Sequence, residues 1–172
     1  VVVTSKIGNF HGDHGDPTAA LDTYRTIASA AQHWASLEPE RLNTLAYVRE
    51  RTAYYAMKSG EAASAEPIIR EALDVYRRAA GASPRPAALR NIAQNLQTLS
   101  EVQKRNGQIT AAIGTLRESL GITEGLLERD AKNVQYPADR GHAWMLLIDL
   151  LLRDGQRDAA LSETRKALEF LE

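Results

Sequence analysis

Apolar side chains recur at steps of three and four residues along most of the chain, with polar side chains between them. One such stripe before Gly107 comprises Leu89, Ile92, Ala93, Leu96 and Leu99, and one after it comprises Ile109, Ala112, Ile113, Leu116 and Leu120. This is the period of an amphipathic α-helix, and no stretch alternates with the two-residue period of a strand between hairpin turns. The pattern predicts an all-α fold with helices at about residues 2–12, 18–37, 40–58, 62–80, 87–105, 109–129, 138–153 and 156–171.

Four glycines are each followed, five residues later, by an alanine. The pairs are Gly15 and Ala20, Gly60 and Ala65, Gly107 and Ala112, and Gly155 and Ala160. The intervals between the glycines are 45, 47 and 48 residues, which indicates internal repetition. Glycine adopts the left-handed backbone conformation that ends a helix, and a lysine or arginine two residues earlier suits the negative end of the helix dipole, as at Lys58, Arg105 and Arg153. The chain is therefore expected to consist of helix pairs joined by tight turns.

The segments around these glycines read GDPTAAL, GEAASAEPI, GQITAAIGTL and GQRDAAL. They resemble the turn between the two helices of a tetratricopeptide repeat (TPR). The TPR pattern also places a small residue seven positions before the glycine, and Gly8, Ala53 and Ser100 agree with it, whereas Ile148 departs from it. The resemblance implies a right-handed α-solenoid of about four antiparallel helix pairs. We expect one TPR-like domain over residues 1–172, with repeats at about 1–38, 39–84, 85–133 and 134–172.

The repeats are longer than the 34 residues of a typical TPR. The chain resembles the TPR arrays found C-terminal to the kinase domain of bacterial serine/threonine protein kinases. Three features carry the resemblance: the long repeat, second helices that end in LLERDAKN or WASLEPE, and a following helix that begins near Arg140. The resemblance implies a regulatory or partner-binding region of a bacterial signalling protein. Because the chain contains no Gly-rich nucleotide loop, His-Arg-Asp or Asp-Phe-Gly motif, we expect no kinase activity in it. A solenoid of helix pairs presents surfaces in place of a catalytic cleft, so we expect no enzymatic activity. The apolar last pair lacks a polar cap, which suggests a fragment of a longer protein.

In the TPR family the first helix of each pair lines a peptide-binding groove. Carried over from the family's positions, the groove residues here are Tyr47, Glu50, Tyr54, Met57 and Lys58, then Gln94, Gln97, Glu101, Lys104 and Arg105, then His142, Met145, Asp149, Leu152 and Arg153, with Asn9 and Asp13 in the incomplete first pair. The resemblance thus implies a protein or peptide partner. TPR modules that grip the C-terminal carboxylate of chaperones place Lys and Asn where this chain has Tyr54, Glu101 and Asp149, so that ligand is not expected.

Composition narrows the possible partners. The net charge of −1 and the pI near 6.5 provide no long-range attraction to nucleic acid or to an anionic membrane. The absence of cysteine excludes disulfides and thiolate metal sites, and no cofactor is expected. The most hydrophobic stretch, residues 144–152, is too short to cross a bilayer. We expect a cytoplasmic module, or an extracytoplasmic one if a membrane span lies upstream in the parent protein.

Two alternative functions remain open at this stage. His11, Asp13, His14 and Asp16 could ligate a metal, or their loop could sense a small molecule, although Asp16 before Pro17 also fits a helix cap. The second alternative is a structural module that self-associates through its terminal repeats. Because the fourth pair is unusually apolar, we expect Trp144, Leu151 and Leu168 to contribute to a surface that a further helix or another copy of the chain covers.

Overall fold

The computed structural model describes residues 2–38, 41–82 and 84–171, and within these ranges the chain forms eight helices and no strand. They divide into two compact units, Val1–Ser83 and Pro84–Glu172. The boundary lies beside the expected break between the second and third repeats. The all-α fold class of paired helices is confirmed, while the expectation of a single domain over residues 1–172 stays a prediction.

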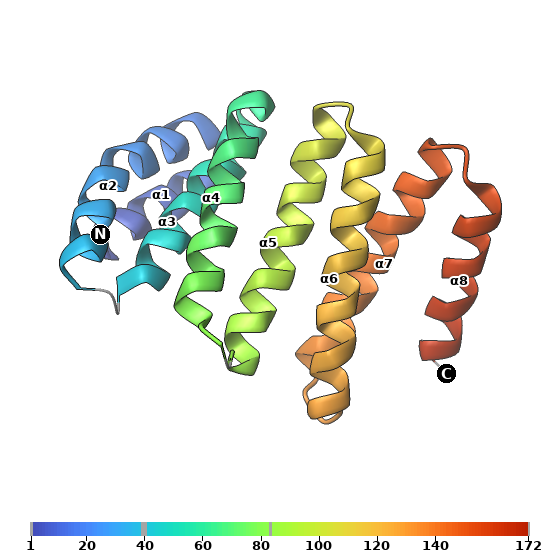
Figure 1. Cartoon of the computed structure of the whole chain (residues 1–172). Coiled ribbons are helices and arrows are strands. Elements are labelled where there is room, and N and C mark those ends of the chain that lie inside the picture. Colours follow the sequence, from blue (N-terminus) through green and yellow to red (C-terminus); the bar gives the residue numbers. More distant parts are fainter. Residues whose placement is uncertain (1, 39–40, 83, 172) are drawn as a thin grey trace. The chain divides into compact units, whose positions relative to one another are not determined.

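The first unit contains α1 (Val2–Asp13), α2 (Pro17–Leu37), α3 (Leu42–Lys58) and α4 (Ala62–Ala80), and each of its helices packs against the next along the chain (Figure 1). Its core is formed by the apolar stripes of α2, α3 and α4, with the buried ring of Tyr24 among them. On α2 the periodicity correctly predicted Tyr24, Ile27 and Ala31 to be inward, but Trp34, expected on the same face, is 39% exposed.

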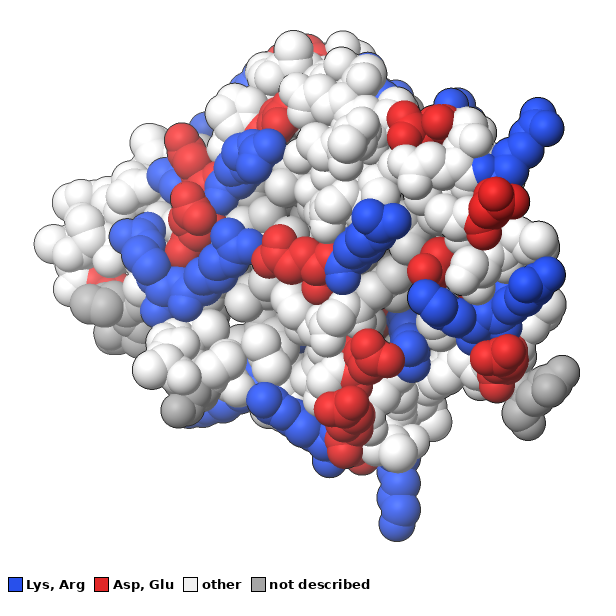
Figure 2. All heavy atoms as spheres, turned by 45° about the vertical axis from the view of Figure 1, so that its right-hand side comes forward, with Lys and Arg blue, Asp and Glu red and all other residues white. Residues whose placement is uncertain are grey.

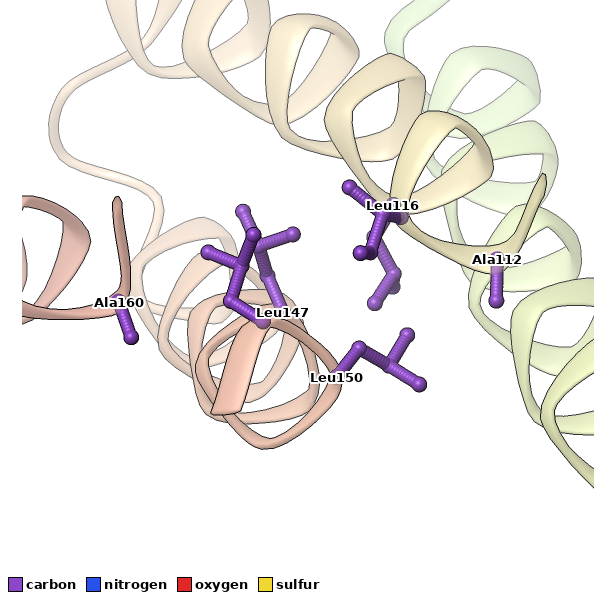
Figure 3. Packing of buried hydrophobic residues seen from close by; sticks show 7 residues of the cluster. Ala112, Leu116, Leu147, Leu150 and Ala160 are labelled. Atoms are coloured by element: carbon purple, nitrogen blue, oxygen red, sulfur yellow. The ribbon is translucent and has the colours of Figure 1, made fainter. Parts of the chain in front are cut away.

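The second unit contains α5 (Pro86–Arg105), α6 (Ile109–Arg129), α7 (Gln135–Arg153) and α8 (Arg157–Leu171). Successive helices pack together, and α5 also contacts α7. Side chains from α6, α7 and α8 converge on one buried cluster (Figure 3), which comprises Ala112, Ile113, Leu116, Leu147, Leu150, Leu151 and Ala160. The contact between α5 and α7 brings together the first helices of two successive pairs.

The same turn joins the two helices of every pair. Gly15, Gly60, Gly107 and Gly155 have φ values of 79°, 90°, 76° and 76°, in the left-handed region. In the third pair, Gln108 donates its backbone N–H to the carbonyl of Gln103 at 2.9 Å, and Ala112 donates to the carbonyl of Gln108 at 3.0 Å. Both bonds recur in the other three turns, and all four repeated alanines are buried. The glycine and alanine pattern therefore encodes one helix-ending motif used four times.

Two glycines of α1 allow aromatic rings to approach the backbone closely. A Cβ atom at Gly8 would lie 2.7 Å from Cε2 of Tyr24, and one at Gly12 would lie 2.0 Å from the hydroxyl oxygen of Tyr55. Both distances are too short for a side chain to be added without displacing the ring. The small residue expected at position 8 is confirmed, and Gly12 has an equivalent role toward α3 that the sequence pattern did not indicate.

Helix α7 begins at Gln135, earlier than the predicted start at residue 138. Pro137 was expected to precede the helix, but it lies within the first turn, where backbone N–H groups have no intrahelical acceptor and proline is tolerated. Asn133 Oδ1 accepts the N–H of Gln135 at 3.0 Å, and the side chain of Tyr136 is buried. Burial of this tyrosine stabilises the additional turn.

Candidate peptide-binding surfaces

Helices α5 and α7 meet through polar side chains at the positions expected to line a groove. Gln97 Oε1 lies 2.8 Å from Nδ1 of His142, and Lys104 Nζ lies 3.6 Å from Oδ2 of Asp149. Gln94 also donates from Nε2 to Asp139 of α7 at 3.2 Å. The structure therefore brings together the predicted residues of these two helices, which lie far apart in the sequence.

Four charged side chains link the C-terminal halves of the two helices. Lys104 pairs with Glu101 at 2.8 Å and with Asp149 at 3.6 Å, and Asp149 also pairs with Arg153 at 2.9 Å. All four are at least partly accessible to solvent, and Arg105, the remaining predicted residue on α5, is exposed. Because the two positive charges balance the two negative ones, this cluster suits a partner that carries both charge signs.

Sequence reasoning missed the ion pair at the opposite end of this contact. Arg90 Nε lies 2.5 Å from Oδ2 of Asp139 and Nη2 lies 3.1 Å from Oδ1, so the guanidinium donates two hydrogen bonds to the carboxylate. Asp139 raises the pKa of Arg90 mainly through this hydrogen bonding. No local pattern marks either residue as a partner of the other, because the pairing depends on the approach of α5 to α7.

Gln97 differs from the expectation for a groove residue because its side chain is only 6% exposed. Its Nε2 donates to the backbone carbonyl of Asp139 at 3.3 Å and lies 3.4 Å from the hydroxyl oxygen of Ser119. Together with the contact to His142, these bonds engage both the oxygen and the nitrogen of the Gln97 side-chain amide within the second unit. Gln97 therefore holds α5, α6 and α7 together, and its side chain is not presented to a ligand.

The inner face of α7 presents apolar side chains to solvent. Met145 is 62% exposed and Leu152 is 56% exposed. They are spaced by two helical turns, so they share a face with His142, Asp149 and Arg153. Next to Met145, an apolar cleft of about 240 Å³ lies between α7 and α8, with Trp144 and Phe170 among its lining residues.

The apolar surface expected at the fourth pair is only partly present. Leu151 is buried in the core of its own unit. Trp144 is also buried, because Arg140 covers its ring at 4.3 Å, Phe170 packs on it edge-on at 5.4 Å, and its indole N–H donates to Glu163. Leu168 is exposed, as expected. Self-association through the terminal repeats stays a prediction, which light scattering over a dilution series would test.

In the first unit, three predicted groove residues, Asn9, Tyr47 and Glu50, are used for internal contacts. The hydroxyl oxygen of Tyr47 accepts a hydrogen bond from Asn9 Nδ2 at 3.1 Å and lies 3.3 Å from the hydroxyl oxygen of Tyr24. Glu50 accepts a hydrogen bond from the hydroxyl of Tyr76 at 3.3 Å. Tyr47 and Glu50 thus join neighbouring helices of this unit.

Three other predicted residues of the first unit, Asp13, Tyr54 and Lys58, line a pocket of about 320 Å³ beside the turn between α1 and α2. The prediction is wrong for Met57, whose side chain is buried and only 4% exposed. Lys58 Nζ lies 5.5 Å from the centre of the Tyr54 ring, and Arg51 Cζ lies 4.9 Å from it. Arg51 was not among the predicted residues, because it does not occupy a TPR groove position. The sequence alone could not predict this pocket, because its lining residues come from two segments that lie far apart in the chain.

The loop with the candidate metal ligands has other contacts. Asp16 caps α2, since its Oδ1 accepts the N–H of Ala19 at 2.9 Å, and the ring of His14 packs on Phe10 with its Nδ1 2.8 Å from the Phe10 carbonyl oxygen. Within the part of the chain that the structure describes, no group of three or more His, Cys, Asp or Glu side chains could hold a metal ion. The capping interpretation of Asp16 is confirmed.

Two further features concern the described part of the chain as a whole. Among the described residues, no helix is both long and apolar enough to cross a membrane. Lysine and arginine side chains alternate with aspartate and glutamate on the face shown in Figure 2. Interspersed charges of both signs produce short-range, local electrostatic recognition in place of a uniform attraction.

The helix pairs, their common turn and the comparisons with known proteins define a TPR-like helix-repeat fold. The solved structure of BtubC (BKLC) from P. vanneervenii is 20% identical, with a TM-score of 0.64 over 87% of this chain and 55% of that chain. The chain thus spans about half the length of that protein. At this identity the similarity concerns the fold alone.

More distant matches cover nearly the whole of both chains. A putative kinesin light chain with nearly identical TPR-like repeats from Podosopora anserina is 13% identical, covers 98% of this chain and 93% of that chain, and has a TM-score of 0.44. MamA from Desulfovibrio magneticus RS-1 is 14% identical over 98% and 93%, with a TM-score of 0.32. No protein-family model and no curated protein sequence matches the chain.

Proposed function

We propose that the chain is a protein-interaction module whose second unit binds an extended peptide segment across the inner faces of α5 and α7. The observation that carries this proposal is the exposure of Met145 and Leu152 on the same face of α7 as Asp149 and Arg153. Exposed apolar side chains next to charged groups provide the two elements of peptide recognition, apolar anchors and polar contacts that fix the register.

The contact between α5 and α7 favours a preorganised surface. The bonds of Arg90 and Gln94 to Asp139, and of Lys104 to Asp149, fix the two helices relative to one another before any ligand arrives. A rigid surface loses little conformational entropy on binding. The charges near Asp149 are partly solvated, so a peptide that carries both charge signs can exchange partners with them at small cost.

A peptide selection with matched variants tests this function. Peptides are selected from a random library on the immobilised chain, and their affinities are measured by fluorescence anisotropy. We expect Met145→Asp combined with Leu152→Asp to weaken binding roughly tenfold or more, because it removes the apolar anchors. Leu161→Asp provides the control, since Leu161 is an exposed leucine on α8. The proposal would be refuted if no specific peptide were selected, or if the Met145→Asp, Leu152→Asp double variant bound the peptide as tightly as the Leu161→Asp control.

We further propose that this module belongs to the regulatory or partner-recruiting region of a bacterial signalling protein, such as a serine/threonine protein kinase, and that it acts in the cytoplasm. Support comes from the repeat length and from the segments that resemble kinase-associated arrays, such as LLERDAKN near residue 130. The complete reading frame of the gene tests both points. A kinase domain upstream would support the proposal, whereas an upstream secretion signal or an unrelated catalytic domain would contradict it.

A further inference from the structure

A second surface of the chain has the composition of an anion site. The pocket beside the turn between α1 and α2 is lined by Gly12 and Asp13 from the end of α1 and by Arg51, Tyr54, Tyr55 and Lys58 from α3. Two of these side chains are cationic and one is anionic. The pocket therefore carries an excess positive charge in a chain whose net charge is −1.

Aromatic contacts fix the guanidinium of Arg51 in this pocket. Its Cζ lies 4.9 Å from the ring centre of Tyr54 and 4.7 Å from that of Tyr55, and Nη2 donates to the Tyr55 hydroxyl at 2.6 Å. Tyr55 is itself buried and stacks on Tyr24 with ring centres 5.7 Å apart. The rings of Tyr54 and Tyr55 thus hold the guanidinium in one position. A guanidinium held against aromatic rings is better suited than a lysine ammonium to bind an oxyanion through paired hydrogen bonds.

The carboxylate of the neighbouring Glu50 acts electrostatically on Arg51, but the cations of the pocket form no close ion pair among the residues that the structure describes. Neither Arg51 nor Lys58 lies within 4.0 Å of an acidic side chain there, and Nε of Arg51 is buried without a hydrogen-bond partner. By contrast, Arg49, two residues away on the same helix, pairs with Glu71 at 3.1 Å. A buried N–H that lacks an acceptor is costly, so the described residues leave part of the hydrogen-bonding capacity of this guanidinium unused.

The arrangement of the two cations indicates the size of the ligand group. Arg51 and Lys58 are two helical turns apart on one face of α3, and both lie over the ring of Tyr54. The pocket volume of about 320 Å³ admits a whole side chain in addition to its charged end. Gly12 lets the Tyr55 ring approach α1 closely at the edge of the pocket, because a Cβ there would collide with the ring.

We propose that this pocket binds the oxyanion of an acidic side chain of a peptide partner, either a carboxylate or the phosphate of a phosphorylated residue. Arg51 and Lys58 neutralise the charge, and Tyr54 contacts the apolar part of the side chain. The inference rests on the proposed function only in that a peptide carries the oxyanion. It adds a site in the first unit that combines the TPR groove positions Tyr54 and Lys58 with Arg51, which is not one of them.

Titration with small oxyanions tests the pocket without any partner. N-acetyl-glutamate and phosphotyrosine are added separately to the ¹⁵N-labelled chain at constant ionic strength, with sodium chloride as the reference. We expect saturable shifts of the Arg51 Nε–H signal and of the Gly12 and Gly15 amide signals with dissociation constants in the millimolar range. The ligand with the smaller constant identifies the carboxylate or the phosphate as the preferred oxyanion.

Three variants separate specific binding from general charge effects. Lys58→Gln and Arg51→Gln should each weaken binding roughly tenfold, while Arg49→Gln, which removes the same charge from the same helix, should leave it unchanged. Lys58 is exposed, so its replacement leaves the fold intact. Shifts that fail to saturate or that chloride reproduces, or equal affinities for Lys58→Gln and the unmodified chain, would overturn the proposal. Peptides that still depend on Met145 in that case would leave the proposed function standing.

Discussion

Replacing Ala112 with leucine should destabilise the second unit, because it adds three carbon atoms at a fully buried position directly after the turn between α5 and α6. Ala112 lies in the cluster with Leu116, Leu147 and Leu150 (Figure 3). If these carbons found space, their burial would add about 2.4 kcal/mol to the free energy of unfolding, at ~0.8 kcal/mol each. In a close-packed core they instead displace neighbours, and the expected loss is about 1–3 kcal/mol.

Urea and thermal unfolding followed by circular dichroism measure this effect. For a unit of this size each kcal/mol lost lowers the melting temperature by about 4–8 °C. Ala111→Leu is the matched control, since Ala111 precedes Ala112 on the same helix but is exposed, and its midpoint should barely move. An unchanged or raised midpoint for Ala112→Leu would show that the alanine is not placed where the paired helices demand a small side chain.

Further measurements test the turn, the ion pair and the buried tyrosine. Gly107→Ala should destabilise by about 1–2 kcal/mol because φ there is 76°, whereas Gly114→Ala, inside α6 with open space around it, should stabilise by about 0.5–1 kcal/mol; equal signs would contradict the assigned turn. Arg90→Gln should cost about 1–3 kcal/mol, and a double-mutant cycle with Asp139→Asn should show coupling, which would be absent if the pair contributed nothing. Burial, followed by the hydrogen bond to a neighbouring tyrosine, raises the pKa of Tyr24. The unfolded chain therefore releases this proton near pH ~10 while the folded chain keeps it, so stability is retained below that pH and falls above it. Urea midpoints between neutral pH and pH ~11 should fall less steeply for Tyr24→Phe, and parallel curves would refute this assignment.

The sequence predicted which residues of α5 and α7 lie near one another, whereas their role in binding stays a prediction. The TPR positions correctly brought Glu101 and Lys104 to Asp149. They also included Gln97, which is buried, and they omitted Arg90 and Asp139. Spacing within one helix shows which residues share a face, whereas burial and ion pairing depend on the distance to the neighbouring helix.

The fold itself was determined largely by local sequence. Gly15, Gly60, Gly107 and Gly155 end their helices through backbone energetics that act within a few residues, and the same bonds form in all four turns. Amphipathic stripes then fixed most of the buried residues of helices such as α4, α5 and α6. Helix ends and buried faces can be predicted from the sequence because they depend on residues separated by only one or two helical turns.

Tertiary structure decided the features that depend on residues distant in the chain. The early start of α7 follows from the burial of Tyr136, the core position of Leu151 from the packing of α6 and α8 around α7, and the pocket at Arg51 from the approach of α1 to α3. In each case the side chain is stabilised, or left accessible, according to how a neighbouring helix buries it or forms polar contacts with it. A one-dimensional pattern specifies which side of a helix is apolar, but the helix packed against it determines which side chains are buried, paired or left accessible to a ligand.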